Sequence, residues 1–223
     1  MCFIYIRCKY LKHNEETYTL VYATLCVLCA LCGEKKHYTC KNYFTLCTKR
    51  SNMDINTLQH IGRATYEPYY QHIWYPGGVE WYIDRCFNTE TLQKELNDPS
   101  IEYALPTDEQ GNIIGLLKVH PLYPTPDGSI EDALYLEKIY LMPDYFGQGI
   151  GQKLLQQVEQ QAIALGRKAI WLQVLHNAAI VGAYAKAGFR ITAPTRFEFD
   201  LLKEEERDGW IMVKPLPFPL HNI

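Results

Sequence analysis

A short glycine-rich turn between a strand pattern and a helix pattern constrains this chain more than any other segment. Residues 133–142 alternate as a β-strand does, and residues 149–165 place apolar side chains at helical spacing. Between them, Gly147, Gly149 and Gly151 let the backbone turn tightly and leave no side chain in front of the amides. A helix start with free N–H groups and a positive dipole end can bind phosphate or pyrophosphate. The turn therefore predicts an α/β or α+β domain with an anion-binding helix start.

The rest of the chain continues this alternation of strand and helix patterns. The sequence predicts strands at 43–48, 101–105, 113–120, 168–174, 189–199 and 210–214. It predicts helices at 79–87, 89–96 and 177–187, and a first helix that runs through Tyr66 after a cap at Asn52 or Asp54. Pro68 is expected to end the first helix. In strand 133–142, strict alternation predicts one face with Leu134, Leu136, Lys138 and Tyr140, and another with Tyr135, Glu137, Ile139 and Leu141. These patterns give α/β (α+β) as the fold class.

The composition is that of a folded, nearly neutral protein. Of the 223 residues, 48% are hydrophobic and 21% are charged, which is too apolar for a disordered chain. The formal net charge is −3, from 22 basic and 25 acidic side chains. This balance argues against nucleic-acid binding through bulk positive charge. It is compatible with a cationic ligand held by local acidic residues.

The first forty residues differ from the rest. Seven of the eight cysteines lie within residues 1–47, and residues 18–32 carry no charge. This run is shorter than the roughly 20 residues of a membrane-spanning helix. We expect residues 1–40 to be a poorly ordered extension or a start assigned too far upstream. A membrane anchor through 18–32 is an alternative, and so is a metal site formed by Cys26, Cys29, Cys32, His37 and Cys40.

The remaining chain then divides into a domain, residues 41–215, and a proline-rich tail, residues 216–223. Two common phosphate-binding motifs do not fit the glycine turn of this domain. A P-loop needs Lys and then Ser or Thr after its last glycine, whereas Gly151 is followed by Gln152 and Lys153. A dinucleotide fold needs an acidic residue at the end of the next strand, and residues 169–174 contain none. A purely structural turn remains an alternative.

The order of the motifs after the turn fits a third type of site. A strand follows, then a helix that contains Tyr184, and then Gly188 and Phe189. In this order the chain resembles the GNAT superfamily of acyl-CoA N-acetyltransferases over residues 41–215, with Gly149 and Gly151 at the positions of its loop glycines. The resemblance implies a mixed central sheet of about six to seven strands, splayed at the cofactor site, with helices on both faces. No metal is expected.

One branch of that superfamily is especially similar. Residues 87–96, 134–141 and 170–174 resemble segments of bacterial spermidine/spermine N-acetyltransferases of the PaiA type. This resemblance implies a primary amine as acceptor, with a polyamine such as spermidine as the candidate. Two positions depart from the superfamily pattern. Phe146 stands where Gln or Arg is usual, and Ala179 stands where Asn is frequent.

The resemblance also implies where acetyl-CoA binds. The cofactor would lie between strands 133–142 and 168–174, with its pantetheine and acetyl carbonyl on strand backbone and its pyrophosphate on amides of the glycine turn. The implied cofactor-binding residues are Ile139, Tyr140, Leu141, Gly147, Gln148, Gly149, Ile150, Gly151, Gln152 and Asn177.

Two side chains are the catalytic candidates. An amine with a pKa near 10.4 is neutral in only about one molecule in 10³ at pH 7, so a base is useful. Glu137, just before the implied acetyl site, is the predicted base; the alternative is a carboxylate that faces solvent or pairs with Lys138 or Arg190. Tyr184 is predicted to protonate the leaving thiolate, whose pKa is near 8.5. The alternative for Tyr184 is a half-buried core tyrosine.

The acceptor pocket is predicted in the segment 67–84. Aromatic faces and carboxylates attract a polycation through cation–π and Coulomb interactions. The predicted substrate-binding residues are Trp74, Tyr75, Glu80 and Asp84. The alternative is ordinary core packing for Trp74 and Trp81 and solvated acids beside them.

Three functions therefore remain open from the sequence. The first is acetyl transfer from acetyl-CoA to a small amine in the cytoplasm. The second keeps this chemistry but uses a protein lysine, a protein N-terminus or an antibiotic amine as acceptor. The third is an acyl-CoA-binding module without catalysis, suggested by Phe146 and Ala179. A homodimer is compatible with each, and no nucleic-acid partner is expected.

Overall fold

The computed structural model describes residues 46–47 and 53–217. All of them belong to one compact unit, Asn42–Ile223. The predictions for residues 1–40, including the anchor and the cysteine metal site, lie outside the described residues, as does most of the 216–223 tail. Among the helices that the structure describes, none is both long enough and apolar enough to cross a membrane.

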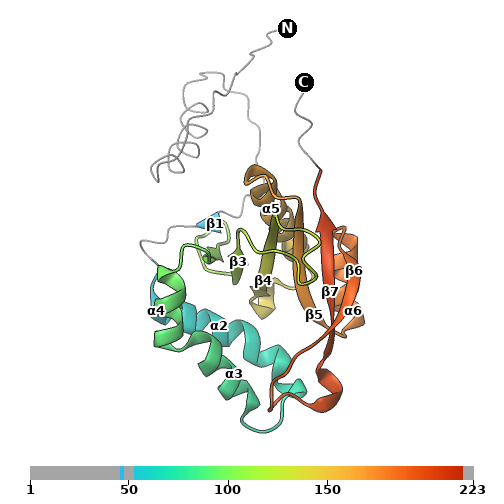
Figure 1. Ribbon diagram of the computed structural model, residues 1–223. Helices are drawn as coiled ribbons and strands as arrows, with labels where there is room; N and C mark the ends of the chain where they lie inside the picture. Colours follow the sequence, from blue (N-terminus) through green and yellow to red (C-terminus); the bar gives the residue numbers. More distant parts are fainter. Residues whose placement is uncertain (1–45, 48–52, 218–223) are drawn as a thin grey trace, which may run out of the picture. The chain divides into compact units, whose positions relative to one another are not determined.

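A seven-stranded mixed sheet forms the centre of this unit (Figure 1), which confirms the predicted fold class. Its order is β1-β2-β3-β4-β5-β7-β6. Only β4 and β5 pair in parallel among the described strands, and every other neighbouring pair is antiparallel. The strands are β1 (Leu46–Cys47), β2 (Glu102–Pro106), β3 (Gly115–His120), β4 (Ala133–Leu141), β5 (Ala169–Leu175), β6 (Arg190–Arg196) and β7 (Asp208–Pro215).

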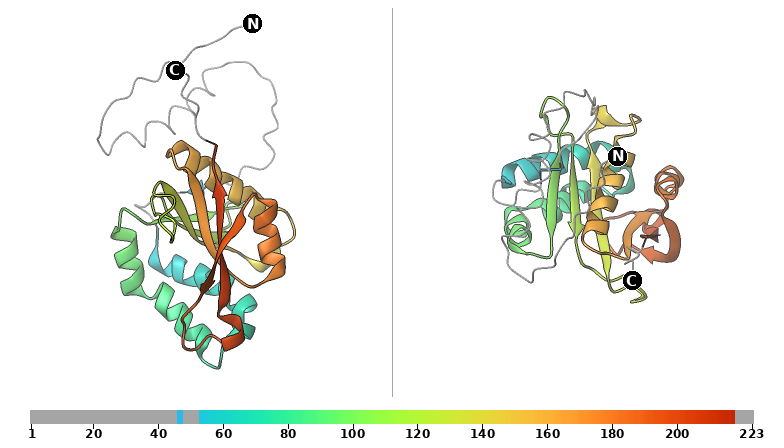
Figure 2. Two further views of the ribbon diagram at one scale, coloured as in Figure 1. Left: turned by 45° about the vertical axis from the view of Figure 1, so that its right-hand side comes forward. Right: turned by 90° about the horizontal axis from the view of Figure 1, so that it is seen from above.

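Five α-helices cover the described part of this sheet. They are α2 (Ile55–Tyr70), α3 (Gly78–Phe87), α4 (Thr89–Asn97), α5 (Ile150–Ala164) and α6 (Ala178–Lys186). Figure 2 shows α4 and α6 at opposite ends of the sheet. Each helix lies within a few residues of a predicted one, because the apolar spacing and the turn residues in the sequence specify them locally.

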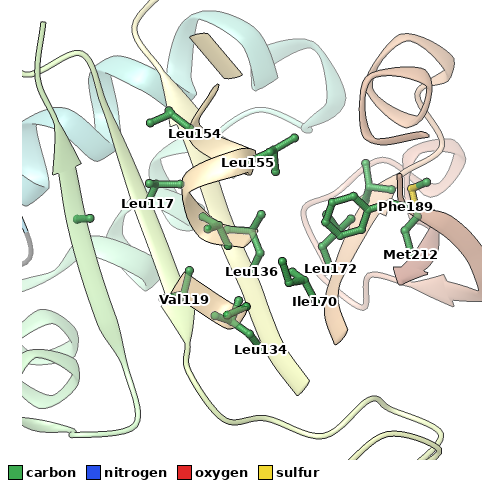
Figure 3. Packing of buried hydrophobic residues seen from close by; sticks show 14 of the residues in the cluster. Leu117, Val119, Leu134, Leu136, Leu154, Leu155, Ile170, Leu172, Phe189 and Met212 are labelled. Atoms are coloured by element: carbon green, nitrogen blue, oxygen red, sulfur yellow. The ribbon is translucent and has the colours of Figure 1, made fainter. Parts of the chain in front are cut away.

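The helices pack on both faces of the sheet. Leu116 belongs to a core with α2, α3 and α4, whereas its neighbour Leu117 belongs to a core with α5. Successive residues of a strand point to opposite faces, so the two cores lie on opposite sides. On α5, the buried residues are the predicted apolar ones, Ile150, Leu154, Leu155, Val158 and Ala162. Figure 3 shows several of them against Leu117, Val119, Leu134, Leu136, Ile170 and Leu172.

Helix α2 is longer than the sequence predicts. It begins at Asp54, whose carboxylate accepts hydrogen bonds from the Asn56 and Thr57 amides. It then continues past Pro68 to Tyr70. A proline within a helix removes one backbone hydrogen bond, and here the packing of the α2 face outweighs that loss. The prediction that Pro68 ends the helix is wrong, and the extra turn carries Tyr69 and Tyr70 toward the sheet.

Strand β4 contains a bulge that the alternation pattern misses. Lys118 pairs with Lys138, but Val119 pairs with Leu136, so Glu137 is an extra residue. A bulge of this kind shifts the alternation by one. Glu137 and Lys138 therefore face the same cavity. The predicted faces are wrong beyond this point: Ile139 and Leu141 pack on the α5 side, and Tyr140 packs with α2 and α3.

Strands β4 and β5 part soon after they meet. They pair only over Ala133–Tyr135 and Ala169–Trp171, although β4 continues to Leu141 and β5 to Leu175. The ribbons of the two strands separate beyond this point (Figure 1). The edge of β4 that follows Tyr135 therefore has no strand partner on the β5 side. This is the splay that the resemblance implied.

Gly115 permits the close approach of β3 to β4 beside the splay. A Cβ atom at this position would lie 2.2 Å from the main-chain oxygen of Tyr140. We therefore expect Gly115→Ala to displace β4 and to lower the free energy of unfolding by about 1–3 kcal/mol. Urea unfolding followed by circular dichroism measures this. Gly182→Ala is the control, because Gly182 lies in α6 with open space around it. Its free energy of unfolding should rise by about 0.5–1 kcal/mol. Equal midpoints for Gly115→Ala and the unmutated protein would contradict the close approach.

Candidate active site

The glycine turn presents unpaired backbone amides to open space. Gly147 and Gly149 have φ angles of 72° and 75°, in the left-handed region that favours glycine. Gly149 is the N-cap of α5 and provides no side-chain cap. The first N–H groups of a helix have no intrahelical partner. Nothing lies within 4 Å of where a Cβ atom would stand at Gly147 or Gly149. This geometry is compatible with a bound anion, and the contact of the turn with a diphosphate remains a prediction.

Two glutamines of the turn hold neighbouring backbone in place. The Gln148 side-chain amide donates to the main-chain oxygen of Asp144 at 2.7 Å. The Gln152 amide donates to the main-chain oxygen of Ala183 in α6 at 2.9 Å. The second bond joins the start of α5 to the residue before Tyr184. This bond restrains the spacing between the predicted anion-binding turn and the predicted proton donor.

Tyr184 lies half-buried on α6, and its ring packs edge-on against Phe189 with centroids 5.7 Å apart. Burial, with a smaller contribution from the nearby Tyr70, raises the pKa of the Tyr184 hydroxyl above its ordinary value. The phenol is therefore protonated at neutral pH. Within the described residues, its oxygen makes no hydrogen bond. A protonated hydroxyl without a partner can donate a hydrogen bond to a bound molecule. The half-buried position also matches the alternative, in which Tyr184 is a core tyrosine.

Asn177 has a structural contact in this structure. Its side-chain oxygen accepts hydrogen bonds from the Ala179 and Ile180 amides, both at 3.1 Å, and so caps α6. A contact of Asn177 with coenzyme A remains a prediction. In contrast with this capped helix, the start of α5 is open.

Glu137 lies within a cluster of charges at the bulge. Its carboxylate accepts hydrogen bonds from Lys118 Nζ at 2.9 Å and from the neighbouring Lys138, and it contacts His120 Nε2 at 2.7 Å. Both lysines are buried, with 4% and 7% of their surfaces exposed. The sequence left open a pairing of Glu137 with Lys138, and this pairing is present. The base role of Glu137 remains a prediction.

The surrounding charges of this cluster determine the protonation state of Glu137. Burial raises the pKa of the carboxyl group, but the His120 hydrogen bond and the charges of Lys138 and Lys118 outweigh it, so the net pKa is well below the usual 4.5. Burial lowers the pKa of Lys138, but Glu137 and the other nearby groups together raise it by more. The net pKa is above its usual value, so the ammonium stays charged. Glu137 is therefore an ionised carboxylate with little affinity for a proton of its own.

The cluster extends to residues that the sequence analysis missed. Lys118 Nζ also donates to Glu95 Oε1 at 2.7 Å, and the Tyr103 hydroxyl donates to the same carboxylate. Lys118 and His120 are two residues apart on a strand that pairs with β4, which puts both beside Glu137. That spacing on a predicted neighbouring strand is a signal that could have pointed to them. Glu95 lies on another element, and only the fold brings it here.

A group of tyrosines packs around the part of β4 that follows the bulge. The Tyr82 and Tyr140 hydroxyls are 3.2 Å apart. The rings of Tyr66 and Tyr70 lie 5.7 Å and 6.4 Å from that of Tyr140. The rings hold Tyr140 against α2 and α3, and this fixes the backbone of Ile139–Leu141 at the splay. The sequence did not predict these contacts because the bulge places Tyr140 on this face, and the Tyr70 contact also depends on the extra turn of α2.

Phe146, which departs from the superfamily pattern, contacts the same helix. Its ring is 46% exposed and lies 4.5 Å from the ring of Tyr69, between centroids. The aromatic side chain therefore joins the glycine turn to the end of α2. This contact gives a physical reason for the departure at position 146, and it leaves the turn amides open.

The predicted acceptor residues are only partly brought together. Trp74 is buried, and its indole N–H donates to the Tyr66 hydroxyl at 3.1 Å, which matches the core alternative. Trp74, the exposed Tyr75 and Glu80 line one cavity of about 560 Å³, near Lys203. Asp84 is exposed and does not line it. Their role as substrate-binding residues remains a prediction.

A second cavity of about 500 Å³ includes the charge cluster. We call it the bulge cavity, and α3, α4, β3 and β4 contribute to it. Its lining residues are Arg85, Cys86, Asn88, Thr91, Glu95, Lys118, Glu137 and Lys138. It lies beside the bulge, in the part of β4 that has no partner on the β5 side.

Replacement of Glu137 tests the charge cluster. Glu137→Gln would leave Lys138 buried without a countercharge, so we expect the free energy of unfolding at pH 7 to fall by about 3–5 kcal/mol. Because the folded pKa is depressed, the contribution of Glu137 is complete above its unfolded pKa and is lost as the pH falls. The difference between the two proteins should therefore shrink from about pH 5 to pH 3.

Urea unfolding across this pH range measures the effect. Glu205→Gln is the control, since Glu205 is exposed and makes no ion pair within the described part of the chain. It should change the stability by no more than about 0.5 kcal/mol. A Glu137→Gln protein as stable as the control at pH 7 would show that the cluster does not stabilise the fold.

Sequence comparison agrees with the geometry. The chain matches the model of the Acetyltransferase (GNAT) family over residues 59–189. An uncharacterised N-acetyltransferase of Mycobacterium bovis is 28% identical over 142 residues, which are 63% of this chain and 84% of that protein. The thialysine N-epsilon-acetyltransferase of Mus musculus is 33% identical over 107 residues, which are 44% of this chain and 61% of that protein.

Solved structures share the fold. The PaiA N-acetyltransferase of Thermoplasma acidophilum, in complex with coenzyme A, has a TM-score of 0.59 at 20% identity over 78% of this chain and 99% of that chain. A mutant of the Vibrio cholerae spermidine N-acetyltransferase SpeG has a TM-score of 0.53 at 18% identity over 75% and 90%. Since the family model spans more than half of the 223 residues, this chain belongs to the GNAT family of acetyltransferases and is an acetyl-CoA-dependent acyltransferase.

Proposed function

We propose that this chain transfers the acetyl group of acetyl-CoA to the primary amine of a small molecule. One observation carries the proposal: beside the unpartnered edge of β4, the open start of α5 is hydrogen-bonded to the helix that carries the Tyr184 hydroxyl. Amides of Gln148–Gln152 would bind the diphosphate of coenzyme A. The backbone of Ile139–Leu141 would hold its pantetheine and the acetyl carbonyl.

The proton of the acceptor amine needs a path out of the site. Glu137 is the proposed base, directly or through water. Because its own proton affinity is low, we propose that Glu137 holds this proton only briefly and releases it to water, while His120 Nε2–H, 2.7 Å from Glu137 Oε2, donates to the carboxylate and orients it. At the other end of the reaction, Tyr184 donates its proton to the departing thiolate of coenzyme A.

The names of the relatives and structural neighbours point to candidate classes of acceptor amine. The PaiA and SpeG proteins share the fold, and the second is named for spermidine; the murine relative is named for thialysine. Spermidine stays a candidate, supported by Tyr75 and Glu80 beside the 560 Å³ cavity. Cytoplasmic location and a homodimer stay predictions.

Tyr184→Phe tests the proton donor. The change removes one hydroxyl, so we expect kcat to fall by about 10²-fold or more while acetyl-CoA binds as before. Thiol release from acetyl-CoA in the presence of an amine panel measures kcat, and calorimetry measures acetyl-CoA binding. Unchanged turnover would reject the role of Tyr184. Turnover with none of the amines, even by the unmutated chain, would favour an acceptor of another class, such as a protein amine.

Two glycines of α5 offer a matched test of the cofactor site. Gly149 and Gly166 lie at opposite ends of the helix, with φ angles of 75° and 70° and open space around both. Alanine at either position costs about 1–2 kcal/mol of backbone strain. Only Gly149→Ala places a methyl group before the open amides, so we expect it alone to weaken acetyl-CoA binding, by about tenfold or more. Calorimetry on both variants measures this. Equal affinities would place the diphosphate elsewhere.

A further inference from the structure

We infer that the acceptor carries a carboxylate as well as its amine, and that Arg85 binds this carboxylate at the bulge cavity. The inference rests on the proposed function, because it names the class of amine that the same site accepts. It replaces a polycation with a molecule of the amino-acid type.

The bulge cavity is placed for an acceptor. Glu137 and Lys138 line it, and they directly precede Ile139–Leu141 on β4. The cavity is on the side of the sheet that α3 and α4 cover, whereas the open start of α5 belongs to the other core. An acceptor in this cavity would therefore approach the splay from the side opposite to the diphosphate site.

The charges of the cavity do not suit a polycation. Three cations line it, Arg85, Lys118 and Lys138, against two carboxylates, Glu95 and Glu137. Both carboxylates already have ammonium partners: Lys118 contacts both, and Lys138 contacts Glu137. The remaining formal charge is positive. Each further ammonium group of a polyamine would meet this charge without a free carboxylate to balance it.

Arg85 provides the unbalanced cation. Its guanidinium carbon lies 5.4 Å from the centre of the Trp81 ring and 5.8 Å from that of Phe199. Within the described residues it makes no ion pair. Aromatic faces orient a guanidinium group and leave its edge N–H donors available. A planar carboxylate is the anion that such an edge binds through two parallel hydrogen bonds.

An aminocarboxylate satisfies both ends of the site. Its carboxylate would neutralise Arg85, and its amine would lie toward Glu137. The diamine that lacks this carboxylate keeps both ammonium groups, so its net charge is more positive by one and it leaves Arg85 without a partner. Such a site selects against polyamines by repulsion as well as for amino acids by attraction.

Matched pairs of acceptors test the inference. Lysine and cadaverine differ by one carboxylate, as do ornithine and putrescine, and spermidine represents the longer polyamines. The measurement is kcat/KM for each, from thiol release at saturating acetyl-CoA. We expect the better amino acid to exceed its decarboxylated partner by about tenfold or more. Equal values within both pairs, or a preference for spermidine, would overturn the inference and leave acetyl transfer to amines intact.

Variants of the arginine separate charge from geometry. Arg85→Gln should raise KM for the amino acid by about tenfold while kcat and the affinity for acetyl-CoA stay unchanged. Its kcat/KM for the diamine should stay the same or rise. Arg85→Lys, which keeps the charge but loses the paired donors, should give an intermediate KM. Arg63→Gln is the control, because Arg63 pairs with Glu67 on the exposed side of α2. If Arg85→Gln left the KM for the amino acid unchanged, the inference would also be overturned.

Binding without turnover provides the second readout. Lysine should bind the coenzyme A complex more tightly than cadaverine in calorimetry, and Arg85→Gln should remove the difference. If no amine turns over but this difference is present, the proposed reaction fails and the carboxylate site stands. If neither lysine nor ornithine binds at millimolar concentration, the carboxylate site fails.

Discussion

The early separation of β4 from β5 determines what the rest of this structure can do. Two parallel strands that stay paired would satisfy each other's backbone groups along their full length. Here the pairing stops after three residue pairs, and β5 keeps its other neighbour, β7, over seven. An open backbone edge therefore lies within the sheet, with the start of α5 and the side chain of Tyr184 beside it. Water or a ligand must satisfy such an edge, so a molecule that extends along it completes the sheet.

The bulge at Glu137 is the second constraint, and it connects stability with chemistry. It turns two successive charged residues of β4 to one side, where Lys118, Glu95 and His120 meet them. A carboxylate that two buried lysines hold ionised stabilises the fold only while it remains charged. The same property limits its strength as a base, so in the proposed reaction the proton must pass on from Glu137 to water.

Much of the fold was predictable because its signals are local. The alternation of 133–142, the apolar face of 149–165 and the glycines between them specify a strand, a helix and an open turn within thirty-odd residues of sequence. The bulge was not predictable in this way, because strict alternation assumes one residue per partner. Nor was the continuation of α2 past Pro68, where tertiary packing outweighs a local signal. The contact of Lys118 with Glu95 depends on how α4 lies over β3, which no single segment specifies.

The hydrogen bond from Gln152 to Ala183 has a further consequence. Since it joins α5 to α6, it restrains the distance from the proposed phosphate-binding amides to the phenol of Tyr184. With the proposed site, acyl donors would therefore be selected by the distance between their phosphates and their sulfur. A thioester on a much shorter carrier than coenzyme A would leave its sulfur out of reach of the phenol whenever its phosphates occupied the helix start.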